Sequence, residues 1–229
     1  MARESYREQL ATLRENALYM SELVLERLRL GLDALEQKDE DLAWEVIEGD
    51  DEINELYLVL ERDCIDLLAL QQPVAGDLRF IASTFKIITD LERIADLAVN
   101  LGDYALDAER DLFPDVDIQE LGDLVIEMVE DAMVAYEAED APATYEIADR
   151  DEGVDAFCNR ASQLVVRDLI ETQLAAEDGA DIETEVERLM ADVQRLLLTI
   201  RDLERVGDHA VNIAARTLYM VDNDDELIY

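Results

Sequence analysis

The stretch DLERIADLAVN at residues 90–100 returns as DLERVGDHAVN at residues 202–212, which is 112 positions further along the chain. Eight of the eleven residues are identical, and two of the three replacements exchange one small or aliphatic residue for another. Leucine, isoleucine, valine and alanine recur inside both copies at three- and four-residue intervals, which is typical of one face of a helix. We therefore expect the same helix to occur twice in the fold.

A second pair of matching segments lies upstream of the two copies. DDEIN at residues 50–54 corresponds to DEGVD at residues 151–155, with an offset of 101. Both segments place an acidic, an aliphatic and a short polar residue at the same relative positions. Since the later offset is 112, the second half contains eleven additional residues (112 − 101), which we place near EDGAD at residues 177–181. The two pairs together indicate an internal duplication.

Long segments of helical periodicity cover most of the chain. Glycine and proline are rare, with 8 and 3 residues, and the clearest interruptions fall between the periodic segments. Asp39 follows the first segment and is suited to an N-cap, while Pro114 separates the two halves. The predicted helices cover residues 2–37, 39–70, 75–110, 117–137, 142–176 and 182–221.

These helices predict an all-α fold of two tandem, duplicated, antiparallel three-helix bundles, because short turns between long helices favour antiparallel neighbours. The first bundle takes residues 1–111 and the second takes residues 115–222. Residues 223–229 form an acidic tail, which we expect to be frayed. Apolar residues make up 50% of the chain, which is enough for a substantial core.

The chain carries 58 acidic and 19 basic residues, which gives a formal net charge of −39. Only two of the basic residues are lysines, and the other seventeen are arginines. Self-repulsion at this charge weakens a fold in dilute buffer, whereas about 1 M salt shortens the screening length to roughly 3 Å. We therefore expect a protein that works in concentrated salt, in the cytoplasm of a halophile.

The same charge argues against several classes of partner. Phosphate backbones and anionic lipid surfaces repel the chain, so we expect no nucleic-acid binding. MARESYREQL at residues 1–10 is charged and precedes no apolar core, and no window approaches 18 uncharged apolar residues. We expect neither a signal peptide nor a membrane span. Cys64 and Cys158 form no metal-binding spacing, and we expect both to be buried free thiols.

The repeated stretch contains paired acids. Glu92 and Asp96 are four residues apart, so a helix places them on one face with Cβ atoms about 6 Å apart. Carboxylates beside amide oxygens suit hard cations such as Mg²⁺, Ca²⁺, Mn²⁺ or iron. The second copy of the pair, and the amides one turn further along each stripe, are Glu204 with Asp208, Asn100 and Asn212.

Chance produces acidic pairs in so acidic a chain, since roughly 14 pairs at this spacing are expected on its helices. Chance does not explain a copied eleven-residue block that contains the pair. Two explanations of the copy stay open and are equally good: a duplicated packing unit with solvated charges, and a metal or partner site. On a helical wheel, Lys86, Asp90 and Arg93 mark a solvent strip. Glu92 and Asp96 are at the edge of the apolar arc, where a carboxylate needs a cation or an arginine more than a solvated one does.

Four segments closely resemble the signature of the PhoU family of phosphate-uptake regulators. They are VIEGDDEIN from residue 46, QQPVAGDLRF from residue 71, and the two copies of the repeated stretch. The resemblance extends to about residue 221 and implies two three-helix bundles, commonly paired as a homodimer, in the cytoplasm. It also implies a negative regulator that docks on the ATPase or membrane subunits of the phosphate-specific ABC transporter and, where one exists, on a sensor histidine kinase.

The resemblance also implies a metal site, because the repeated acidic motif is the family's metal-binding element and some members carry iron, zinc or manganese-type clusters. The motif falls on Glu92, Asp96, Glu204 and Asp208. Ala95 stands where the family usually has glycine, as at Gly207, so an extra methyl group crowds the first site. His209 follows Asp208, but one helical step turns it about 100° away, and we expect an ordinary interface residue.

Other functions are weighed against the regulator. A ferritin-like di-iron enzyme requires Glu-x-x-His, but the residue three before His209 is Val206. One histidine also leaves no Ser/His/Asp or Cys/His set, and no glycine-rich phosphate loop is present, so we expect no enzyme. A metal-buffering protein and a scaffold whose charge serves only solubility stay open as alternatives.

Overall fold

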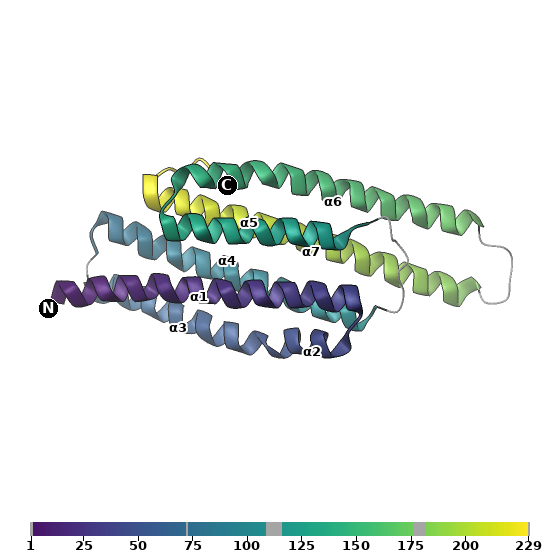
Figure 1. The fold of residues 1–229 in the computed structure, drawn as a ribbon, viewed down its shortest axis with the longest axis horizontal. Coiled ribbons are helices and arrows are strands. Elements are labelled where there is room, and N and C mark those ends of the chain that lie inside the picture. The colour runs from purple at the N-terminus through teal and green to yellow at the C-terminus, as the bar shows by residue number, and fades with distance from the viewer. Residues whose placement is uncertain (1, 72, 109–115, 176–181, 229) are drawn as a thin grey trace.

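The computed structural model describes residues 2–71, 73–108, 116–175 and 182–228, and every regular element in these ranges is a helix (Figure 1). The helices are α1 (Ala2–Gln37), α2 (Glu40–Glu48), α3 (Asp50–Gln71), α4 (Ala75–Leu106), α5 (Ile118–Ala138), α6 (Ala141–Ala175) and α7 (Ile182–Asp222). This confirms the predicted all-α class. Within the described ranges, no helix combines the length and apolarity that crossing a bilayer requires. The predicted break at Pro114 lies outside the described residues.

The single helix predicted at residues 39–70 is wrong, because the chain breaks at Gly49 into α2 and α3. As predicted, Asp39 is the N-cap of α2, and its carboxylate accepts the backbone N–H groups of Asp41 and Leu42 at 2.9 and 3.2 Å. At the other end of α2, the Arg27 guanidinium occupies the space beside Gly49. A Cβ atom on Gly49 would be 2.2 Å from Arg27 Cζ, so the absence of a side chain permits this approach.

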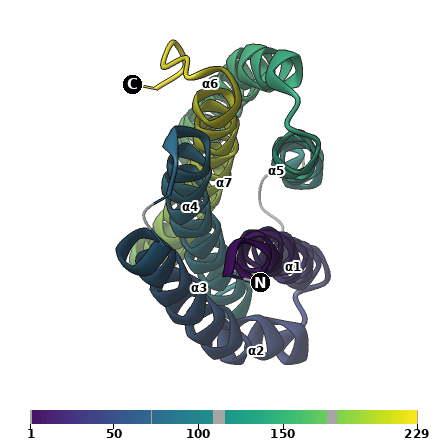
Figure 2. The same cartoon turned by 90° about the vertical axis from the view of Figure 1, so that its left-hand side faces the viewer.

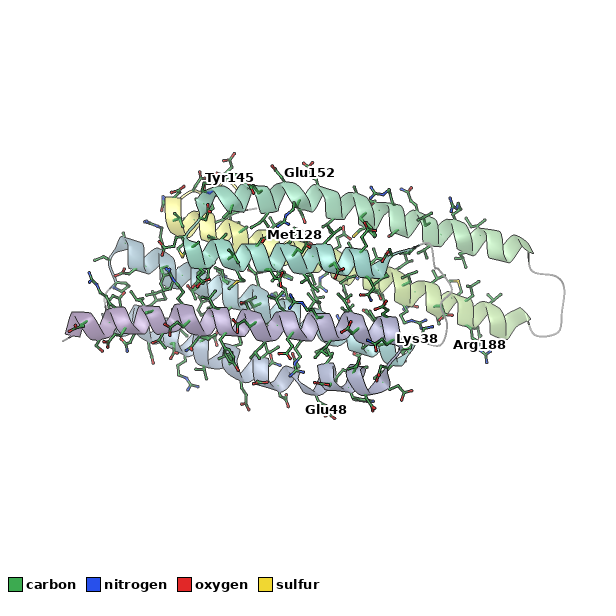
Figure 3. The ribbon with its side chains drawn as sticks, in the orientation of Figure 1. Lys38, Glu48, Met128, Tyr145, Glu152 and Arg188 are labelled. Carbon is green, nitrogen blue, oxygen red and sulfur yellow. The ribbon has the colours of Figure 1, made fainter. Side chains whose placement is uncertain are left out.

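Two helical bundles are arranged side by side along their long axes (Figures 1 and 2). The first contains α1 to α4 and the second contains α5 to α7, with α4 packed on α7 and α1 packed on α5 between them. Because the apolar stripes of α4 and α7 are buried, Leu91, Ile94, Leu203 and Val206 are fully inaccessible at the centre of the molecule. Met128 of α5 is buried in the same core (Figure 3).

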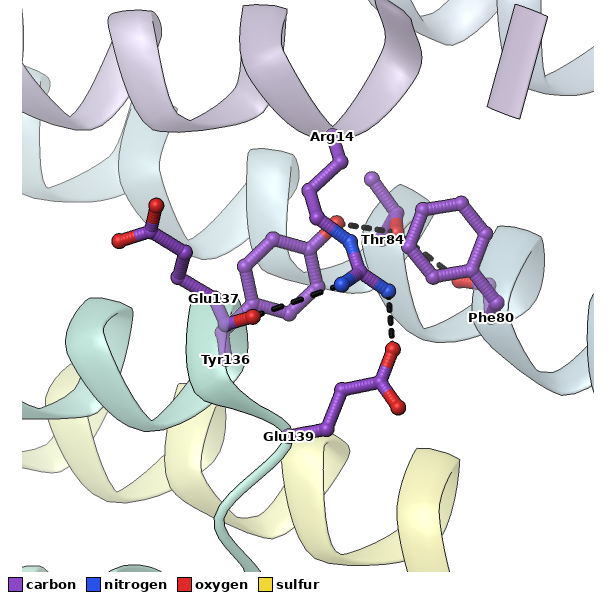
Figure 4. Close-up of polar contacts among 6 residues, drawn as sticks. All are labelled: Arg14, Phe80, Thr84, Tyr136, Glu137 and Glu139. Carbon is purple, nitrogen blue, oxygen red and sulfur yellow. Dashed lines mark hydrogen bonds and ion pairs between the residues drawn. The ribbon is translucent and has the colours of Figure 1, made fainter. Parts of the chain in front are cut away.

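Helices α6 and α7 project past the ends of the other helices on one side of the molecule (Figure 1). The insertion predicted near residues 177–181 falls between them, outside the described residues. At the opposite end, Arg14 of α1 joins the two bundles (Figure 4). Its guanidinium pairs with the Glu139 carboxylate and lies over the rings of Phe80 and Tyr136, with centroid distances of 5.0 and 5.9 Å.

Residues 223–228 are not the frayed tail that we expected. Asn223 has a φ of 57°, which ends α7, and the Ile228 N–H donates to the Asp225 carbonyl at 3.0 Å. The segment therefore forms a turn beside α6, where the Tyr145 hydroxyl donates to a Glu226 carboxylate oxygen at 3.4 Å. The expected free thiols are confirmed: Cys64 and Cys158 are buried and unpaired, and burial raises both thiol pKa values to about 12.

Candidate functional site

The first acidic cluster forms where α3 packs against α4. Because α3 begins directly after the break at Gly49, its first residue, Asp50, faces the helix that carries Glu92 and Asp96. Burial, and after it the charge of Asp96, raises the pKa of Asp50. The same two causes, in the same order, raise the pKa of Glu92. Asn54, one turn into α3, donates its amide N–H to Asp50 Oδ2 at 2.6 Å.

The second acidic cluster forms where α6 packs against α7, and it contains four carboxylates. Burial, followed by the charges of Asp155, Asp208 and Glu204, raises the pKa of Asp151 to about 6. Burial and the charge of Asp155 also raise the pKa values of Glu204 and Asp208. These carboxylates are therefore held close enough to repel one another, and their charged forms are destabilised.

Asp151 is the least satisfied member of the second cluster. Its Oδ1 atom is buried, and no donor among the described residues reaches it. A Cβ atom on Gly207 would be 3.3 Å from the same oxygen, so the glycine leaves the carboxylate its room. A buried carboxylate oxygen without a donor is costly, and a cation is one partner that removes this cost.

The two clusters are copies of each other. The offset of 101 maps Asp50 to Asp151 and Asn54 to Asp155, and the offset of 112 maps Glu92 to Glu204 and Asp96 to Asp208. The copies differ at two positions. An amide in the first cluster replaces a carboxylate in the second, and the first carries Ala95, which is 2% exposed, in place of Gly207.

The structure thus brings all four predicted acids into clusters and adds four residues that the prediction missed. The missed residues are Asp50, Asn54, Asp151 and Asp155. Their signal was present in the sequence, because DDEIN and DEGVD were already recognised as copies of one segment. Acidic residues that are copied on two helices of each repeat are expected to lie at the contact between those two helices.

The predicted amide ligands do not join the clusters through their amide N–H groups. Asn100 donates to Asp202 Oδ2 at 3.1 Å, and Asn212 donates to Asp90 Oδ1 at 3.4 Å, so both amides bridge α4 and α7. His209 also faces Asp90, with 2.9 Å between Nδ1 and Oδ1, in agreement with an interface residue. The assignment of Asp90 to a solvent strip is wrong, because its side chain is only 15% exposed and bridges the two repeats.

Asp202 occupies the equivalent position in the second copy and is satisfied differently. Besides Asn100, it accepts the Tyr104 hydroxyl at 2.8 Å and an Arg205 N–H at 3.3 Å. Burial, followed by the hydrogen bond to Asp202, raises the pKa of Tyr104 to about 12. The contacts of Asn100 with Asp202 and of Asn212 with Asp90 are exchanged by the repeat offset of 112, which gives the α4–α7 interface an approximate twofold symmetry.

The donor set fits a hard cation, since it offers carboxylate oxygens, one of them orphaned, and no thiolate. In the described residues, however, no three acidic, histidine or cysteine side chains converge in a geometry that could hold a metal ion. Metal binding would therefore require these carboxylate side chains to move toward one another.

Comparison with known protein families and sequences gives a consistent result. The PhoU domain family matches residues 18–105 and again residues 118–217. The phosphate-specific transport system accessory protein PhoU homolog of Pseudomonas aeruginosa is 32% identical over 225 residues, covering 97% of this chain and 87% of that protein. PhoU homolog 1 of Methanothermobacter thermautotrophicus, which has the same description, is 33% identical over 219 residues, covering 94% of each chain.

Solved structures show the same architecture. The crystal structure of PhoU from Pseudomonas aeruginosa matches with a TM-score of 0.83 at 32% identity, covering 96% of this chain and 100% of that chain. The phosphate transport system regulatory protein PhoU from Streptococcus pneumoniae matches with a TM-score of 0.83 at 28% identity, covering 96% and 98% of the two chains. The duplicated bundle is therefore an architecture that these proteins share.

Proposed function

The chain belongs to the PhoU family, and we propose that it is a negative regulator of phosphate uptake that docks on the phosphate-specific ABC transporter. The observation that carries the proposal is the pair of equivalent acidic clusters, one in each repeat, in a chain that matches phosphate-transport accessory proteins over nearly its whole length. The proposed partners are the transporter's ATPase or membrane subunits and, where the host has one, a sensor histidine kinase. We place this regulator, acting as a homodimer and not as an enzyme, in the cytoplasm.

We propose that a metal ion of the iron, zinc or manganese type binds at each cluster. The second cluster would use Asp151, Asp155, Glu204 and Asp208, and the first would use Asp50, Glu92 and Asp96 with the Asn54 oxygen. A bound cation neutralises carboxylates whose burial and mutual repulsion otherwise raise their pKa values, and it fixes α3 to α4 and α6 to α7. The second cluster is expected to bind more tightly, since it has one more carboxylate and the space beside Gly207.

In the proposed mechanism, the acidic faces of a rigid helical bundle contact the transporter when phosphate is plentiful. Docking shifts the transporter away from its transport-competent state only if the bundle binds the resting state more tightly. Both clusters lie on helices that are packed into one core, so the two faces are held in a fixed relation. Binding through both faces at once raises the overall affinity for the transporter without additional contacts at either face.

The test is an affinity capture from the native host in molar salt. The bait is compared with a variant that carries Glu92→Gln, Asp96→Asn, Glu204→Gln and Asp208→Asn. A matched control removes four exposed carboxylates from α1, with glutamine at Glu8, Glu15, Glu22 and Glu26. We expect the wild type and the control to recover the transporter ATPase and the cluster variant to lose it.

Phosphate uptake and metal content give independent measurements. In a strain lacking the gene, uptake of labelled phosphate in rich phosphate is expected to rise, and the wild type and the α1 control restore its restraint. Unchanged uptake in that strain would contradict the regulator. Stoichiometric metal in a protein that captures no transporter would favour metal buffering, and neither metal nor transporter would favour a scaffold.

A further inference from the structure

The outward side of α3 presents a stripe of aliphatic side chains. Leu58 and Ile65 are seven residues apart, which is two helical turns, and they are 55% and 51% exposed. Val59 and Leu68 border them and are 48% and 36% exposed. In Figures 1 and 2, α3 lies at the outer edge of the first bundle. We call these four residues the α3 stripe.

The α3 stripe is separate from the core face of the same helix. Ile53, Leu60 and Cys64 are buried and lie on the opposite side of α3, where the helix packs against α1 and α4. Single exposed aliphatic residues are common on protein surfaces, but clusters of them mark contact sites. Of the 14 large hydrophobic residues that are exposed in the described part of the chain, four fall within these eleven positions.

The second repeat presents a related surface. The offset of 101 maps Ile65 to Val166 of α6, which is 47% exposed, and Ile170 one turn later is 54% exposed. The aliphatic character of this outer position is therefore present in both copies, although the two residues are not identical. The same offset maps Leu58 and Val59 to Asn159 and Arg160, so the complete stripe is present in the first repeat alone.

Charge identifies the kind of partner. From Asp50 to Gln71 the helix carries seven acidic residues and one base, Arg62. Glu55 and Asp66 are exposed on the same side of α3 as the stripe, where Arg62, also exposed, lies between Leu58 and Ile65. A second copy of this chain would place such carboxylates against their own copies, and like charges across an interface are costly. A basic partner would gain from the same arrangement.

We propose that the α3 stripe docks an amphipathic helix of a partner protein whose apolar face is bordered by lysine and arginine. Side chains seven residues apart interdigitate with the equivalent positions of a second helix, and the acidic borders select the basic helix. This inference rests on the proposed docking function and adds to it the surface and the chemistry of the partner.

The test uses two synthetic helices that share a leucine face, one bordered by lysine and the other by glutamate. Binding to the full-length protein is measured at the lowest salt concentration that keeps it fully helical, because higher salt screens the charge difference between the two helices. We expect the lysine-bordered helix to bind and a Leu58→Gln/Ile65→Gln variant to bind it about tenfold more weakly or worse. Val134→Gln on α5 is the matched control, because Val134 is 60% exposed outside the stripe.

Each result decides the proposal. Equal binding by the double variant and the wild type, or equal binding of the two synthetic helices, would overturn it. Self-association of the wild type that the double variant abolishes would assign the stripe to a second copy and also overturn it. Unaltered circular dichroism of the double variant excludes misfolding as the cause of lost binding. The proposed regulatory function is tested separately. If it is wrong, phosphate uptake in the deletion strain is unchanged, independently of whether the synthetic helices bind.

Discussion

At Asp151, burial and three neighbouring carboxylates raise the pKa of one side chain to about 6. The orphaned Oδ1 atom shows why the cost is not relieved, since no donor among the described residues reaches it. Proteins retain such costs where a ligand removes them. The metal-free cluster is therefore expected to be the weak point of the second repeat at neutral pH.

The first prediction concerns Asp151→Asn in metal-free buffer. The folded pKa of about 6 is above the ordinary value of 3.8, so the folded state holds the proton more tightly. Stability from this group is full below about pH 4 and is lost as the pH rises through about 6. Asp151→Asn should raise the free energy of unfolding at pH 7 by about 1 kcal/mol after allowance for solvent screening, with little change at pH 4.

Chemical denaturation at both pH values, in the presence of a chelator, measures this difference. The matched control is Glu152→Gln, because Glu152 is the next residue on α6 but is exposed and points away from the bundle (Figure 3). Parallel stability curves for Asp151→Asn and the wild type would show that the pKa of Asp151 is not raised in the folded chain.

The second prediction concerns the buried pair of Thr84 and Tyr136, whose hydroxyl oxygens are 2.7 Å apart. Thr84 Oγ1 is also 2.9 Å from the Phe80 carbonyl, to which it donates, so the Tyr136 hydroxyl is the donor to Thr84. Tyr136→Phe removes one hydrogen bond and should cost about 1 kcal/mol. Thr84→Val leaves a buried phenol without a partner and should cost about 2 kcal/mol or more.

The double variant distinguishes this explanation from a simple loss of packing. With both hydroxyls absent, no buried polar group is left unpaired, so Thr84→Val/Tyr136→Phe should be more stable than Thr84→Val alone. Thermal or urea unfolding of the three variants provides the comparison. Additive costs would show that no hydrogen bond couples Thr84 to Tyr136.

Half of each acidic cluster could be predicted from the residues, because i and i+4 positions on one helix are fixed by helical geometry. The partners on α3 and α6 required knowledge of which helices meet. Asp90 shows the limit most clearly. A wheel built for one helix assigns it to solvent, whereas His209 and Asn212 of a different helix cover it.

Among the elements, four helix C-termini are stabilised in the same way. The last turns of α2, α4, α5 and α7 contain no basic residue, although a cation there is favourable to the helix dipole. An arginine from another helix donates to a carbonyl at or near each of these ends instead. The pairs are Arg27 with Glu45, Arg195 with Asp107, Arg14 with Glu137, and Arg79 with Met220.

This pattern gives the rare bases of a very acidic chain a structural role, since one guanidinium can reach a carbonyl and a carboxylate together. Arg195, for example, bonds the Asp107 carbonyl at 2.6 Å and pairs with Asp192. The forked geometry of arginine permits both contacts, and lysine does not reproduce it. Sequence periodicity predicts most helix ends to within a few residues. It does not predict the break at Gly49, because the contact made there comes from Arg27 of α1, a different helix.

The third prediction tests that break by a double-mutant cycle at Gly49 and Arg27. A Cβ atom at position 49 displaces the guanidinium, which then loses its 3.2 Å bond to the Glu45 carbonyl. The backbone of Gly49 has a φ of −76°, which alanine adopts without strain, and alanine reduces the entropy of the unfolded chain by about 0.5 to 1 kcal/mol, which offsets that loss. Gly49→Ala should therefore change wild-type stability by less than about 0.5 kcal/mol and stabilise an Arg27→Ala chain by about 0.5 to 1 kcal/mol.

The measured quantity is the free energy of unfolding of all four chains of the cycle. A coupling near zero, with the same effect of Gly49→Ala in both backgrounds, would mean that Arg27 does not depend on the glycine. Circular dichroism of each variant gives the helical content and detects any fusion of α2 and α3 into one helix.

In the whole molecule, carboxylates are found in two settings: a few are buried at the approximately twofold-symmetric α4–α7 interface, and most are at the surface. The α4–α7 interface buries Asp90 and Asp202 at equivalent positions and satisfies each one from the other repeat. The duplication could be predicted from the sequence, but the antiparallel pairing of α4 and α7 could not. The sequence of one repeat does not specify how that repeat packs against the other. The remaining carboxylates are mostly at the surface, where the charge of −39 opposes compaction.

The last prediction follows from that charge. Because screening by salt weakens repulsion between exposed carboxylates, the thermal midpoint should rise by at least about 5 °C between ~0.1 M and ~1 M KCl. The rise should be steep at first and level off near ~1 M, where the screening length is already roughly 3 Å. Sucrose at matched osmolality is the control, since it is excluded from protein surfaces but screens no charge. A linear response to both solutes would assign the effect to exclusion, and full structure and stability at ~10 mM salt would refute the proposed dependence on concentrated salt. The shape of the salt curve, and not its direction alone, therefore decides whether the acidic surface makes this fold dependent on its medium.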